Sequence, residues 1–309
     1  MMMASSVGMT GKIGARVLGA SCTWGDRLKA LLQRVAMLVL GPCGTVLGIG
    51  AEAEEKRGYH LFRPVPTELM RDFVTDRPDF TEAAITVPAG HFQAEISFFD
   101  LSRDTTAGTR TESDMLGNVN LKLGLLDNVD IQFVFDAFRE TRTTTGGVLT
   151  ESEGFGDLTT RLKINLWGND GGGTAFALFP YVKIPTGSAL SNDKWEGGII
   201  LPFSMDLTDE VSFGAMLQPN LVYDATSNGY DLDWIHTFVF GLPVTETVGT
   251  YLEYVGIAGS GAGLDYQAIF SGGFTWVAAE NVQFDVGVRV GMNAAAENFG
   301  VFSGVSVRY

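Results

Sequence analysis

The most constraining feature of this sequence is a strict alternation of apolar and polar residues, repeated in long segments from His91 onward. In one of the clearest segments, apolar side chains occupy every second position, at Val282, Phe284, Val286, Val288, Val290 and Met292. The positions between them hold Gln283, Asp285, Gly287, Arg289 and Gly291. Successive side chains of a β-strand point to opposite faces, so this pattern predicts strands with one apolar and one polar face.

Twelve such segments follow one another along the chain. They span 91–101, 113–125, 129–139, 156–167, 174–185, 195–207, 211–223, 231–244, 248–258, 264–278, 282–293 and 298–309. Most exceed the roughly five or six residues of a soluble strand and suit a tilted strand that crosses a bilayer of ~30 Å. We therefore predict an all-β fold, a membrane-spanning antiparallel up-and-down β-barrel of about 12 strands.

The connections between these segments alternate in length. Four of them are short turns, at 126–128, 208–210, 245–247 and 279–281, whereas the one at 140–155 is long. Short turns on the periplasmic side and longer loops outside are typical of outer-membrane barrels. The same orientation puts both ends of the barrel in the periplasm.

Aromatic residues support a membrane barrel over a soluble β-sandwich, which buries its apolar faces between two sheets. Trp167, Trp195, Trp234 and Trp276 all fall near predicted strand ends, as interfacial aromatic girdles would. The last residue, Tyr309, is aromatic and ends an amphipathic strand. We interpret it as an assembly signal for the barrel-assembly machinery.

Residues 1–53 have the features of a signal peptide. The uncharged run 35–51 follows the basic residues Arg27, Lys29 and Arg34, and small residues at 51 and 53 offer a cleavage site. The stretch before Arg27 is long, so the true start could lie downstream of Met1. Residues 54–90 are then an N-terminal periplasmic or plug segment, with a short helix near Pro66–Phe73, and 91–309 form the barrel.

Charge and cysteine content exclude several classes. With 36 acidic against 21 basic residues, the net charge is −15, which argues against a nucleic-acid partner. The two cysteines, Cys22 and Cys43, both fall in the predicted signal peptide. The remainder can form neither disulfides nor thiolate metal sites. We predict no cofactor and no bound metal. We also predict no enzymatic activity, since His236, the one mid-strand histidine, has no serine at the next position on its face.

If the apolar faces meet lipid, the polar faces line the lumen. The predicted lumen residues, which carry both signs of charge, are Glu95, Lys122, Asp136, Asp157, Arg161, Lys163, Lys183, Glu253, Asp265, Asp285, Arg289 and Arg308. Such a lumen can pair its charges across neighbouring strands, or it can set a transverse field for a polar permeant.

Several motifs resemble one family, the outer-membrane transporters assigned to the meta pathway of phenol degradation. They are DRPDFTE at 76–82, VPAGHFQ at 87–93, GFGDL at 154–158, RLK at 161–163, PYVKIPTG at 180–187 and YLEY at 251–254. The motifs occur in order, and the resemblance covers nearly all of 60–309. It implies an outer-membrane barrel that admits small, often aromatic, compounds.

The sequence thus predicts an outer-membrane transporter or channel for small molecules, of a hydrophobic or aromatic kind. Its expected partners are outer-membrane lipid and lipopolysaccharide, the barrel-assembly machinery and the permeant. The main alternative is a closed structural barrel without transport activity. A wide general porin is disfavoured because such barrels use about sixteen or more strands.

Overall fold

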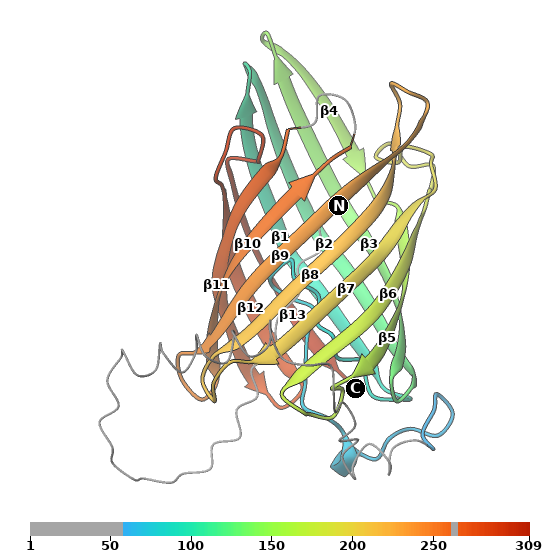
Figure 1. Cartoon of the computed structure of the whole chain (residues 1–309). Coiled ribbons are helices and arrows are strands. Elements are labelled where there is room, and N and C mark those ends of the chain that lie inside the picture. The colour runs from blue at the N-terminus through green and yellow to red at the C-terminus, as the bar shows by residue number, and fades with distance from the viewer. Residues whose placement is uncertain (1–57, 261–264) are drawn as a thin grey trace, which may run out of the picture.

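The computed structural model describes residues 58–260 and 265–309, most of which lie in antiparallel strands (Figure 1). The strands are β1 (Phe92–Thr106), β2 (Thr109–Leu126), β3 (Val129–Thr145), β4 (Val148–Gly154), β5 (Leu158–Trp167), β6 (Thr174–Ile184), β7 (Glu196–Asp206), β8 (Ser212–Asp224), β9 (Gly229–Pro243), β10 (Val248–Ala258), β11 (Gln267–Ala279), β12 (Val282–Gly291) and β13 (Phe299–Arg308). Each predicted segment corresponds to one strand. The predicted signal peptide, the start of the N-terminal segment and residue 264 lie outside the described residues.

The strands close into a barrel. Each strand of the ring pairs antiparallel with its neighbours, and β1 closes on β13 from Gln93 opposite Arg308 to Arg103 opposite Phe299. Among the described residues, twelve strands form the ring, as predicted, and β4 pairs with β3 alone. β4 continues the line of β5, because 139–145 of β3 pair with β4 and 129–134 pair with β5.

The two faces of the wall have opposite character. In β12 the outward side chains of Val286, Val288 and Val290 are each more than 40% exposed, whereas the inward Asp285 is 4% exposed. An apolar surface with a polar interior reverses the arrangement of a soluble protein and matches a barrel surrounded by lipid. The period-two alternation therefore predicted the two faces correctly.

Three strands run further than the sequence predicted. β1, β2 and β3 extend above the apolar band, and the hairpins β1–β2 and β3–β4 rise over the other strands in Figure 1. This upper part carries threonines and charges in place of alternating apolar residues, yet it still pairs, with Arg103 Nη1 2.5 Å from Asp114 Oδ1. The stretch 140–155, predicted as a loop, is therefore mostly the top of β3 and the whole of β4. Strand pairing does not require an apolar face, and alternation alone cannot detect it.

The predicted tryptophan girdles lie on the outer surface. Trp167 and Trp276 are near the short-turn end of the barrel, and Trp195 and Trp234 are near the opposite end, all of them 39–58% exposed. The described chain also begins and ends at the short-turn side (Figure 1).

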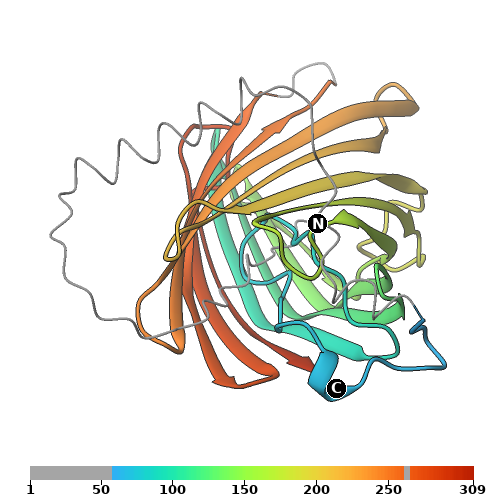
Figure 2. The ribbon, with the colours of Figure 1, turned by 60° about the horizontal axis from the view of Figure 1, so that its bottom comes forward.

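The segment before β1 enters the barrel. Its predicted short helix is a single 3-10 turn, η1 (Thr67–Leu69), and the backbone then runs irregularly through the lumen (Figure 2). So short a helix gains little from its own hydrogen bonds, and the barrel wall binds this segment instead. From residue 75 to 89 almost every side chain is buried. We call residues 65–90 the plug segment. No helix in the described part of the chain is long and apolar enough to cross a membrane.

Candidate functional site: a lumen filled by the plug segment

Most predicted lumen residues point inward and are buried. These are Glu95, Lys122, Asp136, Asp157, Arg161, Lys163, Glu253, Asp285, Arg289 and Arg308. Lys183 lies at the rim, with its Nζ 2.6 Å from Glu196 and 3.3 Å from Asp157. Asp265 differs from the prediction, because β11 begins only at Gln267 and Asp265 is exposed in front of it. Many of the inward residues bind the plug segment, and Glu95 and Arg161 among them also border a cavity.

Asp76 is the centre of the charged contacts. One carboxylate oxygen accepts from Lys122 on β2, and the other lies 2.7 Å from Lys163 Nζ on β5. Glu95 on β1 shares Lys122 at 2.5 Å and accepts from the backbone N–H of Asp76. Burial alone would raise the pKa of Asp76, but the charges of Lys122, Lys163 and Arg161 outweigh it and lower that pKa well below its ordinary value.

Arg77 joins the plug segment to the far wall. Its Nε and Nη2 donate to the two carboxylate oxygens of Asp285 on β12, at 2.9 and 2.7 Å. Its Nη1 donates to the Ser97 hydroxyl on β1 at 2.5 Å. This two-pronged arrangement is the geometry in which arginine binds a carboxylate best.

Glu253 on β10 binds backbone, not a cation. Its carboxylate accepts from the N–H groups of Phe80 and Thr81, at 2.8–3.0 Å, and from the Thr81 hydroxyl at 2.7 Å. The Thr81 hydroxyl also lies 2.6 Å from that of Thr237 on β9. Irregular backbone inside a membrane barrel needs such partners, because lipid cannot supply them.

Further contacts fix the rest of the segment. Glu82 accepts from Arg161 Nη1 on β5 at 2.6 Å, and Asp130 on β3 accepts from the N–H of Val87 at 2.9 Å. At the short-turn end, Arg71 pairs with Asp127 and Asp170. Buried ion pairs thus join plug and wall from Arg71 to Glu82, and hydrogen bonds to the backbone hold the residues beyond.

Such pairs hold the two partners together firmly. Removing one member of a buried ion pair typically costs about 3–5 kcal/mol, because the other charge stays buried without compensation. The contacts are nevertheless all non-covalent. The plug segment precedes β1, and the ring closes between β1 and β13 without it.

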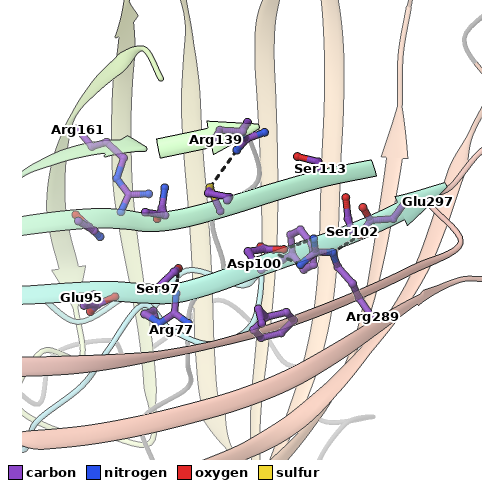
Figure 3. Close-up of a pocket in the computed structure, with 15 residues that line it drawn as sticks. Arg77, Glu95, Ser97, Asp100, Ser102, Ser113, Arg139, Arg161, Arg289 and Glu297 are labelled. Atoms are coloured by element: carbon purple, nitrogen blue, oxygen red, sulfur yellow. Dashed lines mark hydrogen bonds and ion pairs between the residues drawn. The ribbon is translucent and has the colours of Figure 1, made fainter. Parts of the chain in front are cut away.

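The plug segment separates two voids. A cavity of about 290 Å³ lies above it, bordered by plug residues Arg77 and Phe80 and by strands β1, β2, β3, β5, β12 and β13 (Figure 3). Figure 3 shows Arg289 bound to Asp100 and Glu297 along one wall of this cavity. A second void of about 220 Å³ lies at the short-turn end, beside Phe73 and Arg308.

The plug residues of the site were missed by the sequence prediction. Asp76, Arg77, Asp79 and Glu82 fall in a motif quoted for its resemblance, but they lie outside the predicted strands and carry no alternation. One signal was present, since four charged residues within seven positions directly before a membrane barrel mark a segment that needs charged partners.

Residues 75–309 match a family model described as "Putative MetA-pathway of phenol degradation". The chain belongs to this family. The match confirms the resemblance carried by the motifs and includes most of the plug segment as well as the whole barrel. Among curated proteins there is no sequence match to this family member.

Solved structures resemble this family member in fold. An outer-membrane channel from Pseudomonas putida F1 has a TM-score of 0.53 and 14% identity, over 76% of this chain and 99% of that one. The KdgM porin has a TM-score of 0.43 and 9% identity, over 68% and 97%. The translocator domain of autotransporter NalP from Neisseria meningitidis has a TM-score of 0.45 and 8% identity, over 71% and 88%. The first of these likenesses shows that the family member has the barrel fold of an outer-membrane channel.

Proposed function

We propose that the protein is an outer-membrane channel that admits small hydrophobic or aromatic molecules when the plug segment leaves the lumen. The observation that carries this proposal is a complete barrel whose interior is filled by a segment that contributes nothing to ring closure. Such a segment can move while the barrel stays folded. Family membership and the channel fold support the same function.

The cavity above the plug segment supports a small permeant. Its volume of about 290 Å³ is at the small end of ligand pockets, which typically measure about 300–1,000 Å³. Phe80, Phe302 and Met115 give it apolar surface between polar groups. A compound with a single ring and one polar substituent fits this mixture of walls.

The apolar outer surface with its two girdles supports a place in the outer membrane, with lipid and lipopolysaccharide around the barrel. In that orientation the short turns and the entry of the plug segment face the periplasm. The barrel-assembly machinery is the proposed route of insertion.

One observation favours the alternative, a closed structural barrel. Buried ion pairs bind the plug segment from Arg71 to Glu82, and a barrel that never opens would show the same contacts. The channel and the structural barrel differ in whether the plug segment can leave the lumen.

Single-channel conductance in planar bilayers tests the proposal. Residues 54–309 and a chain beginning at Gly90 are refolded separately, with folding checked by heat-dependent gel migration. We expect low conductance from the longer chain and steady conductance from the shorter one. Silence from both folded proteins would contradict a channel through the lumen and favour the structural barrel.

Selectivity is measured on the shorter chain in liposomes. We expect single-ring aromatic alcohols to enter faster than sugars of similar mass, because Phe302 and Met115 of the cavity wall remain in the shorter chain. Equal rates would contradict the proposed permeant class without contradicting a channel.

A further inference from the structure

Asp79 is a buried acid without a partner. It lies in the middle of the plug segment and is 1% exposed. Within 58–260 and 265–309, neither of its carboxyl oxygens has a hydrogen-bond partner. An ionised carboxylate in such a place loses its hydration and gains neither a hydrogen bond nor an ion pair in exchange. The neutral, protonated acid is much less destabilised by the same burial.

The neighbouring carboxyl is satisfied as an anion. Glu253 accepts from two backbone N–H groups and from the Thr81 hydroxyl, and each of these donors favours the ionised form. Asp79 is the residue next to Phe80, whose N–H binds Glu253. Of the two acids, Asp79 therefore holds a proton more firmly than Glu253.

The cationic side chains near Asp79 form ion pairs with other carboxylates. Arg77 forms its ion pair with Asp285, and Arg161 with Glu82. Lys122 and Lys163 both bind Asp76. None of these described ion pairs includes Asp79.

The charged and titratable groups around Asp79 reinforce this state. Glu253 and Tyr251 face it from β10, and Glu82 and Asp76 from the plug segment. Burial raises the pKa of Asp79 well above its ordinary range, and the charges of Glu253, Glu82 and Asp76 raise it further. Outside the lumen, the same side chain would be in water and ionised at neutral pH.

We propose that docking of the plug segment takes up one proton at Asp79, and that loss of this proton at higher pH releases the segment from the lumen. The reaction is a protonation only: the carboxylate of the free segment accepts a proton from water, and the docked segment holds it as a neutral acid. The claim that this proton controls conductance rests on the proposed function. The claim that it controls docking of the plug segment does not.

Proton linkage sets the size of the effect. Between the ordinary pKa of an aspartate, about 3.9, and the raised pKa of docked Asp79, the docking constant falls up to tenfold for each pH unit. Above the raised pKa it reaches a lower plateau. Docking is therefore tight in acid and weakens toward alkaline pH.

Conductance of the whole chain in planar bilayers is the first test, as a function of pH, for the wild type and for Asp79→Asn. The amide has the size of the neutral acid and cannot ionise. We expect the open fraction of the wild type to rise with pH and that of Asp79→Asn to stay low throughout. The same rise in both proteins, or no rise in the wild type, would overturn the proposal.

A readout of docking separates the two proposals. Ala83 is 5% exposed in the plug segment, and Cys22 and Cys43 are the chain's two cysteines. The test chain carries Ala83→Cys, Cys22→Ser and Cys43→Ser. We expect its labelling by a bulky maleimide to become faster as the pH rises, after the rate is corrected for the pH dependence measured with a free thiol. Asp79→Asn in the same chain should abolish this increase. Labelling that follows pH while no variant conducts would contradict the channel and support the proton switch.

Infrared spectroscopy and one control variant complete the design. We expect the carbonyl stretch of a protonated carboxylic acid in the wild type and a weaker band in Asp79→Asn; an unchanged band would count against the assignment. Asp285→Asn, which weakens the partner of Arg77, should raise the open fraction at every pH. This control shows that a released plug segment opens the pore, whatever the state of Asp79.

Discussion

Arg77 and Asp285 lie 208 positions apart in the sequence, yet their side chains meet in a buried two-pronged ion pair with N–O distances of 2.9 and 2.7 Å. The pair joins the plug segment to β12. It shows how the polar face of the barrel wall is used: the inward charges hold a segment of the same chain.

The first prediction concerns this pair. Asp285→Ala should weaken docking of the plug segment by about 3–5 kcal/mol, because Arg77 stays buried without its partner. Limited proteolysis at residues 65–90 measures the change. Arg77→Met combined with Asp285→Leu removes both charges and should restore much of the protection. Unchanged cleavage of Asp285→Ala would show that the pair does not hold the segment.

Acid should not release the plug segment. The pKa of Asp76 is held well below its ordinary value by Lys122, Lys163 and Arg161 against the effect of burial. A lowered carboxyl pKa stabilises docking above about pH 4, and this contribution is lost only as the pH falls through the lowered value. We expect protease protection to persist at pH 4 in the wild type and to be lost at neutral pH in Asp76→Asn. Release of the wild-type segment at pH 4 would contradict this account.

Gly304 provides space for the plug segment. A Cβ at this position would lie 2.6 Å from the guanidinium of Arg77 and 2.4 Å from the backbone oxygen of Ile96. Gly304→Ala should therefore weaken docking by about 1–3 kcal/mol, the usual cost of overpacking. The matched control is Val301→Ala on the lipid-facing side of the same strand, which should leave protease protection unchanged.

The outward face of β12 should tolerate no charge near the bilayer centre. Val286→Arg is expected to destabilise the barrel by about 2–4 kcal/mol in lipid vesicles, measured by urea unfolding. Thr144→Arg, in the part of β3 above the apolar band, serves as the control and should change stability little. Equal effects at both positions would contradict the proposed depth of the barrel.

Tyr309 should matter for assembly more than for stability. Its backbone pairs with that of Phe92, but its side chain is 75% exposed. Tyr309→Ser should leave the unfolding of the refolded barrel nearly unchanged and reduce the amount of barrel assembled in cells. Normal assembly of this variant would remove the interpretation of Tyr309 as an assembly signal.

The alternation of apolar and polar residues was enough to predict the strands of the barrel wall. It failed in other parts of the chain, for physical reasons that can be named. The alternation in 282–293 predicted which side chains of β12 face inward, because the period of a strand is two regardless of its neighbours. It missed β4 and the tops of β1 to β3, where pairing outside the apolar band needs no apolar face. It included Asp265, which has the right phase but precedes the first paired residue of β11.

The sequence by itself determined the number of strands in the ring, their inward and outward faces and the family. These properties depend on residues close together in the chain. Only the tertiary structure decided where the plug segment runs, that Arg77 meets Asp285, and that Asp79 is left without a cation beside Glu253. Such pairings join distant positions, and no local periodicity records them. The proton proposed at Asp79 is a property of the closed lumen, since desolvation exists only once the segment is inside the barrel.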